Sequence, residues 1–91
     1  MYLIKELLGG NERVWFDINQ SDFTQFLTYA LEQGCTWMDG STINPDKDNC
    51  SHHMGINNEL KLGFVSMWCW FSGASNTPKI IKFDEIKKEI L

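Results

Sequence analysis

Residues 21–40, SDFTQFLTYALEQGCTWMDG, decide the fold that this sequence predicts. Apolar side chains recur in this stretch at helical spacing, which places them on one face of an amphipathic helix. They are Phe23, Phe26, Leu27, Ala30 and Leu31. Ser21 or Asp22 can cap the start of this helix, and Gly34 suits the left-handed residue that ends one. We therefore expect a main helix over about 21–33 that packs on a sheet.

The sequence around this helix predicts the strands of that sheet. Short runs rich in β-branched and aromatic residues are bounded by turn residues, which is typical of strands. The expected strands are 13–18, 35–38, 52–56, 59–62 and 79–83. Asn57-Asn58 favours a tight hairpin turn, because asparagine tolerates positive φ. Residues 1–8 fit a helix or a strand, and the second arm of the hairpin can run on through 63–71.

The predicted fold class is α+β in a single compact domain over residues 1–91. We expect an antiparallel sheet of about four to six strands with the main helix on one face. Asp84 can cap a short C-terminal helix over about 84–90. Pro45 and several Asn and Asp residues make 41–51 a loop.

Charge and composition exclude several classes of function. The net charge is −4 and no Lys/Arg cluster occurs, which argues against direct DNA or RNA binding. The longest apolar run, 63–71, is too short to span a membrane. Three cysteines without a C-x-x-C pair, and a start unlike a signal peptide, indicate reduced thiols. We expect a cytoplasmic protein.

Catalytic and metal motifs are weak in this sequence. It contains no G-x-S-x-G, phosphate-loop or dinucleotide pattern, so we expect no enzyme and no cofactor. Cys50, His52 and His53 are the best candidates for a small metal site. Adjacent strand residues point to opposite faces, however, and zinc-ligand spacing is absent, so we expect no metal.

The four tryptophans are the strongest functional signal, because a core of this size readily absorbs only one or two. Trp68 and Trp70 share one strand face, and Trp37 precedes a turn. Either all are core residues, or some form a surface that stacks on a planar ligand or fills a pocket of a partner. The candidate binding residues are Trp37, Asp39, His52, His53, Ser66, Trp68 and Trp70.

A looser signal comes from the order of short motifs along the chain. F-x-x-F-L (23–27), G-x-x-W-x-x-G (34–40), an Asn-turn hairpin and KIIKFDEI (79–86) follow one another. This arrangement resembles that of very small phage- and prophage-encoded accessory proteins over about residues 14–86. The resemblance implies a compact α+β fold and a non-enzymatic role, often in blunting a bacterial immune system, and a phage-encoded protein would act in the host cell cytoplasm. The loop 41–51 and the Trp68/Trp70 pair lie outside the pattern, and no site residue is carried over.

These observations lead to one functional expectation with two alternatives. We expect a non-enzymatic phage-type protein that sequesters a nucleotide-like immune signal, and that forms a homo-oligomer to enclose its ligand. The first alternative is an acidic inhibitor that binds a host defence protein, as anti-CRISPR proteins do. The second is a small metal-binding protein that uses Cys50, His52 and His53.

Overall fold

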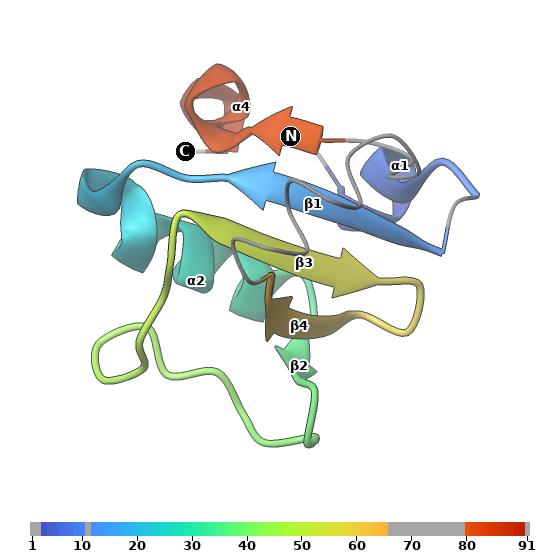
Figure 1. The fold of residues 1–91 in the computed structure, drawn as a ribbon, viewed down its shortest axis with the longest axis horizontal. Helices are drawn as coiled ribbons and strands as arrows, with labels where there is room; N and C mark the ends of the chain where they lie inside the picture. Colours follow the sequence, from blue (N-terminus) through green and yellow to red (C-terminus); the bar gives the residue numbers. More distant parts are fainter. Residues whose placement is uncertain (1–2, 11, 66–79, 91) are drawn as a thin grey trace.

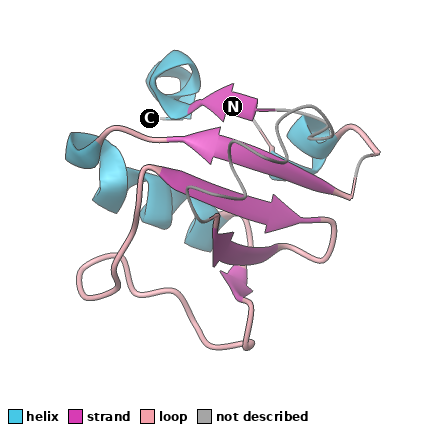
Figure 2. Cartoon of the chain, in the orientation of Figure 1, coloured by secondary structure: helices cyan, strands magenta, loops and turns pink. Residues whose placement is uncertain are grey.

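A computed structural model describes residues 3–10, 12–65 and 80–90, which form one mixed sheet with helices (Figures 1 and 2). The strands are β1 (Arg13–Asp17), β2 (Thr36–Trp37), β3 (His53–Asn57), β4 (Lys61–Phe64) and β5 (Ile80–Lys82). The helices are α1 (Ile4–Leu8), α2 (Phe23–Glu32) and α4 (Phe83–Ile90), and a 3-10 turn at Gln20–Asp22 precedes α2. Within the described residues, no helix has the length and apolar character needed to cross a membrane.

The α+β class and the main helix over the sheet are confirmed. The sheet has five strands in the order β2-β4-β3-β1-β5. The three central strands pair antiparallel, as expected, whereas the edge strands β2 and β5 run parallel to their neighbours β4 and β1. The sheet is therefore mixed, because each edge strand arrives from a distant part of the chain and not from a hairpin.

Both ends of the described chain are helical. Residues 4–8 are helical, and Gly9 ends α1 with a φ of 57°. The C-terminal helix begins at Phe83, one residue before the expected start, and it buries Phe83 and Ile86. Asp84 lies inside the first turn, where its carboxylate pairs with Lys87 at 2.7 Å.

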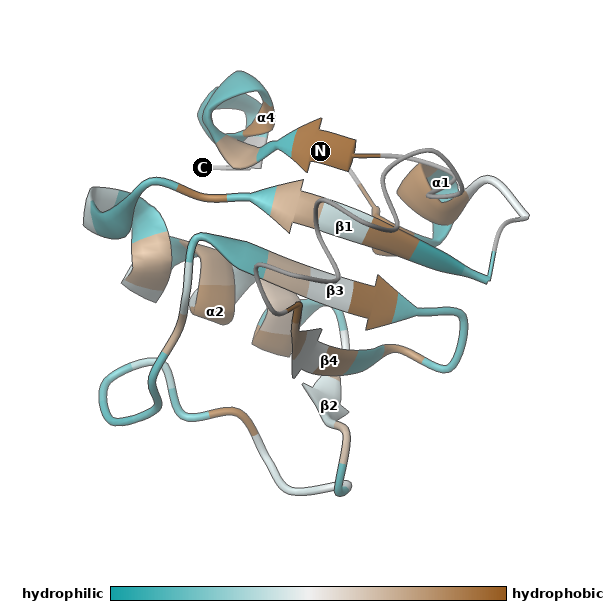
Figure 3. Ribbon diagram, in the orientation of Figure 1, coloured by the Kyte–Doolittle hydropathy of each residue, from teal (hydrophilic) through white to brown (hydrophobic). Residues whose placement is uncertain are grey.

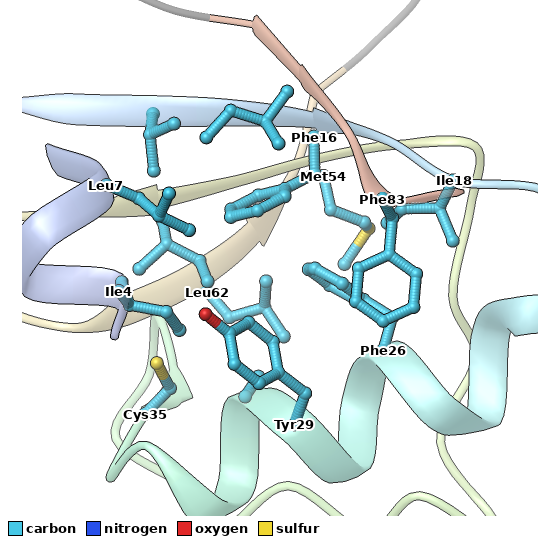
Figure 4. Close-up of a cluster of buried hydrophobic side chains, with 14 of the residues drawn as sticks. Ile4, Leu7, Phe16, Ile18, Phe26, Tyr29, Cys35, Met54, Leu62 and Phe83 are labelled. Atoms are coloured by element: carbon cyan, nitrogen blue, oxygen red, sulfur yellow. The ribbon is translucent and has the colours of Figure 1, made fainter. Parts of the chain in front are cut away.

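One face of the sheet packs against α2 and forms the hydrophobic core (Figure 4). The expected row Val14, Phe16 and Ile18, from β1 and the residue that follows it, is fully buried. From α2, Phe26 packs against Phe16 and Phe83, with ring centroids 5.1 and 5.4 Å apart. The continuous buried cluster shows that α2, α4 and the sheet share one core.

The buried face of α2 is rotated relative to the expectation. Phe26, Leu27 and Ala30 are buried as predicted, but Leu31 is 37% exposed and Tyr29 is only 1% exposed. Tyr29 lies between the sheet and α1, with its hydroxyl directed toward Ile4 and Cys35 (Figure 4). Burial raises the pKa of Tyr29 to about 12, and nearby Cys35 and Glu6 add to the rise. A helix-period count treats tyrosine as a surface residue, which explains the error.

Asp22 does not cap α2 as expected. It occupies the N-cap position, but its side chain makes no capping hydrogen bond. Its buried carboxylate instead accepts two hydrogen bonds from the Lys87 ammonium on α4, at 3.1 and 3.3 Å. The start of α2 is thereby tied to α4, a contact that local sequence does not reveal.

The predicted helix stop at Gly34 is confirmed. Gly34 has a φ of 86°, its N–H donates to the Leu31 carbonyl, and the Cys35 N–H donates to the Ala30 carbonyl. This pair of reversed hydrogen bonds is the Schellman motif, which needs a left-handed residue at the glycine position. The corner directs the chain into β2.

The hairpin between β3 and β4 forms, but its turn differs from the expectation. Asn57 is the last residue of β3, and Leu60 adopts the positive φ, 59°, that was assigned to an asparagine. The Asn57 side-chain oxygen accepts hydrogen bonds from the Glu59 and Lys61 N–H groups, at 2.9 and 3.0 Å. The loop therefore spans residues 58–60 (teal at its centre in Figure 3), and strand pairing begins at Lys61.

The rotation of α2 predicts a contrast between two leucines one turn apart. Leu27→Ala should lower the free energy of unfolding by about 2–5 kcal/mol, since it leaves a cavity in the core. Leu31→Ala should change it by about 0.5 kcal/mol or less, because this side chain is partly solvated. Urea unfolding followed by circular dichroism measures both values. Equal losses for the two variants would contradict the assigned face.

The Schellman corner predicts a purely conformational cost at Gly34. No atom lies within 4 Å of a Cβ built on Gly34, so Gly34→Ala meets no steric obstacle. It should still destabilise the protein by about 1–2 kcal/mol, the cost of a left-handed L-residue. Gly34→Asn should recover part of this loss in the same unfolding assay. A neutral Gly34→Ala variant would show that the corner tolerates another backbone geometry.

Candidate functional site

The face of the sheet turned away from α2 has two glycines directly opposite each other. Gly55 of β3 pairs with Gly63 of β4, and Trp15 of β1 pairs with Gly55 on the other side. Met38 follows β2, where its N–H donates to the Leu62 carbonyl and its side chain lies over Gly63. A row across the sheet therefore reads Met38, Gly63, Gly55, Trp15, with large side chains at its ends and two glycines between them.

The two large side chains lean over the glycines. A Cβ on Gly55 would lie 3.2 Å from Trp15 Cδ1 and from Val65 Cγ2, and a Cβ on Gly63 would lie 3.2 Å from Met38 Cγ. Any other residue at these positions would push against Trp15 or Met38. We call the depression over this backbone the glycine slot. It is lined by Glu12, Arg13, Trp15, Met38, Gly55, Ile56, Asn57, Asn58, Gly63, Phe64 and Val65.

The size and lining of the glycine slot suit a small molecule. Its volume is about 500 Å³, within the range of small-molecule sites. The distance from β1 to β2 is three strand spacings, roughly 14 Å, and the side chains of Trp15, Val65 and Met38 occupy part of this width. Met38 is 61% exposed, which leaves apolar surface for a ligand to cover, whereas the Phe64 ring lies against Trp37 at the edge of the sheet.

Polar groups gather at the end of the glycine slot nearest the hairpin turn. Arg13 begins β1 with its guanidinium carbon 6.0 Å from the centre of the Trp15 ring. Glu12 precedes it, and Asn57 and Asn58 lie opposite. Because the Asn57 oxygen is held by two backbone N–H groups, its amide nitrogen has a fixed orientation. One cation, one carboxylate and two amides thus border an apolar floor.

A second hollow lies beside β2, at the edge of the sheet, and involves two of the predicted residues. Trp37 stacks on Phe64, with centroids 5.6 Å apart and planes 11° from parallel. Its indole N–H donates to Asp48 Oδ2 at 2.7 Å, and the Asn44 N–H donates to the same oxygen. Asp39 closes its own turn by accepting from the N–H and hydroxyl of Ser41. Trp37 and Asp39 therefore hold the loop that spans 38–50 in place.

The histidines do not join this group. His52 precedes β3, where its Nδ1 lies 2.8 Å from the Ile18 carbonyl oxygen and its ring meets Phe23 edge-on. The hydrogen bond to a carbonyl makes Nδ1 the protonated nitrogen. His53 is the first residue of β3 and lies at the end away from the hairpin turn. Neither histidine lines the glycine slot.

Ser66, Trp68 and Trp70 lie outside the described residues, so the predicted indole pair is not placed. The residues that border the glycine slot were not singled out from the sequence. The available signal was the pair of isolated glycines, Gly55 and Gly63, inside two strands of one hairpin. Glycine in a strand often marks a close approach of another group, here Trp15 and Met38.

Thiol and metal chemistry find little support in the described part of the chain. Burial raises the pKa of Cys35 and of Cys50 to about 11, so both thiols are protonated at neutral pH. A protonated thiol is a poor nucleophile and a poor metal ligand. Among residues 3–10, 12–65 and 80–90, no three His, Cys, Asp or Glu side chains form a group able to hold a metal ion.

Comparison with known proteins gives no relative from which a site could be transferred. No family model matches the sequence, and searches of curated proteins and of solved structures return no match either. The arguments below therefore start from the geometry of the glycine slot.

The Trp37–Asp48 hydrogen bond predicts an acid-sensitive loop. The Asn44 N–H, and then the Trp37 indole N–H, lower the pKa of Asp48 below its usual 3.8. A depressed pKa stabilises the fold above the unfolded-state value, and this contribution is lost as the pH falls through the folded value. The melting temperature of the wild type should therefore exceed that of Asp48→Asn near neutrality, and this difference should shrink below about pH 4.

Asp46→Asn in the same loop is the matched control, because its carboxylate has no hydrogen bond in the described structure. Its melting temperature should follow that of the wild type across the same pH range. A difference between wild type and Asp48→Asn that stays constant down to pH 2 would contradict the role given to the charged Asp48.

Proposed function

We propose that this protein is a non-enzymatic binding protein that sequesters a nucleotide-like signal in the glycine slot. The observation that carries this proposal is the hollow at the Gly55–Gly63 pair, where the side chains of Trp15, Val65 and Met38 approach the two glycines closely. A planar base in this hollow would contact the side chains that cover the two glycines, above all the exposed Met38. Trp15 is only 6% exposed, so burial of the apolar Met38 surface, and not stacking on an open indole face, would bind the base, and this needs no basic surface.

The biological role proposed for this binding is interference with bacterial immunity. The resemblance to phage-encoded accessory proteins supports it, because several immune systems signal through small nucleotides. Sequestration needs no catalysis, which fits a slot bordered by amides, one cation and one carboxylate. The negative net charge of −4 is compatible with a free nucleotide and unfavourable for a nucleic-acid backbone.

A second candidate, an inhibitor that docks on a host protein, is favoured by the exposed apolar side chains beside the slot. Met38 and Phe64 are the most exposed large apolar residues in the described part of the chain. Together with the acidic net charge they could engage a basic effector. Homo-oligomer formation stays part of either proposal, and light scattering of the purified protein tests it.

Isothermal titration calorimetry with cyclic di-AMP, cyclic di-GMP and cyclic tri-AMP tests the first candidate. At least one should bind the wild type with a stoichiometry of one or of a simple fraction. Gly63→Val should weaken that binding about tenfold or more, since its side chain fills the floor of the slot. The variant should stay folded, because a β-branched residue suits a strand and Met38 is flexible.

Thr42→Val provides the control, since it introduces the same side chain outside the glycine slot. Its binding should match that of the wild type. If no cyclic nucleotide binds, and the protein instead co-purifies with a large host protein in a salt-sensitive manner, the second candidate replaces the first.

A further inference from the structure

We infer that the glycine slot selects a phosphodiester, with a single negative charge per phosphate, and discriminates against nucleoside triphosphates. This inference rests on the proposed function and adds the chemistry of the anionic group and the residue that binds it. The proposed anchor is Arg13, with the base beside Met38 in the slot and the phosphate at the hairpin end.

The position of Arg13 supports its role as the anion-binding residue. Among the described residues that border the slot, it is the one cation. It is exposed at the start of β1, and the ion pairs of the described structure involve Lys87 and not Arg13. Its guanidinium lies 6.0 Å from the centre of the Trp15 ring, a distance typical of cation–π contact. The guanidinium is thus held beside the floor with its hydrogen-bond donors available.

The surrounding charges limit how much negative charge a ligand can bring. Glu12 borders the slot next to Arg13, so the charges of the lining residues cancel. The whole protein has a net charge of −4, which adds repulsion toward any anion. One diester phosphate can pair with Arg13 while staying away from Glu12. A triphosphate would leave most of its charge unpaired beside a carboxylate.

The two asparagines complete this selection. Asn57 and Asn58 border the same end of the slot, and Asn57 Nδ2 is held in place by the hydrogen bonds to its own Oδ1. An amide offers hydrogen bonds without charge, which suits the edge of a base or the ribose. The slot therefore offers one charged contact and several neutral ones, which suits one phosphodiester with its nucleoside, while the other phosphates of a cyclic ligand would have to face solvent.

The test compares ligands of different charge with matched Arg13 variants, again by calorimetry. Wild-type protein should bind its preferred cyclic dinucleotide or trinucleotide at least tenfold more tightly than ATP or GTP. Arg13→Gln should weaken binding of the cyclic ligand by about 10- to 100-fold, the range for loss of a charged hydrogen bond. Arg13→Lys should retain part of the affinity, since it keeps the charge but loses the planar fork.

Lys47→Gln is the control, because it removes an exposed cation of the 41–51 loop that does not border the slot. Raising the salt concentration should weaken binding to the wild type and to Lys47→Gln, and should affect Arg13→Gln less. Circular dichroism melting curves establish that each variant is folded.

The outcomes separate this inference from the proposed function. If cyclic nucleotides bind and Arg13→Gln binds them as tightly as the wild type, the role given to Arg13 is wrong. The glycine slot could then still be the binding site. If ATP or GTP binds as well as the cyclic ligands, the selection for a diester is wrong. If none of these nucleotides binds, the proposed function fails and the inference fails with it.

Discussion

The register between β3 and β4 is the constraint on which the rest of the sheet depends. The Asn57 side chain, bonded to the Glu59 and Lys61 N–H groups, makes the turn three residues long and sets Gly55 opposite Gly63. The same register directs Met54, Ile56 and Leu62 into the core, where all are fully buried. A slip by one residue would exchange the two faces of a strand, burying glycines and exposing the core.

This constraint links stability to the candidate function. The core needs large apolar side chains on one face of the hairpin, and in this register the other face is left with two glycines. Gly55 and Gly63 weaken the strands entropically, since glycine loses the most backbone freedom on folding. Contacts of Trp15 and Val65 over Gly55, and of Met38 over Gly63, offset part of that cost. A sheet selected for stability alone would place β-branched residues at both positions.

Much of the fold could be predicted from the sequence because its signals are local. The α2 periodicity, the Gly34 stop and the β1 alternation each follow from spacing within a few residues. The turn was harder. The sequence favoured positive φ at Asn57-Asn58, but Leu60 takes that conformation, because the Asn57 side-chain oxygen accepts hydrogen bonds from the Glu59 and Lys61 N–H groups. The Asp22–Lys87 pair joins residues 65 positions apart, so no local pattern could reveal it.

The candidate site was largely beyond sequence reasoning for the same reason. Trp15, Met38, Gly55 and Gly63 come from four separate strands or strand ends, and only the sheet order brings them into one row. Trp37 and Asp39 were selected for their chemistry, but the structure uses them to fix the loop beside β2. The number of tryptophans led to the prediction of a binding surface. The position of the slot is marked instead by two glycines, Gly55 and Gly63, which carry no functional group.

Backbone amide mapping by NMR tests most directly whether the glycine slot is the binding site. Gly55 and Gly63 contribute amide signals from the floor itself, whereas Gly9, Gly34 and Gly40 report on turns elsewhere. On addition of a cyclic dinucleotide or trinucleotide, we expect the Gly55, Gly63 and Arg13 signals to shift and those of Gly9 and Gly34 to stay in place. Shifts confined to the turns or to α2, or no shifts at millimolar ligand, would contradict a binding site on the glycine face.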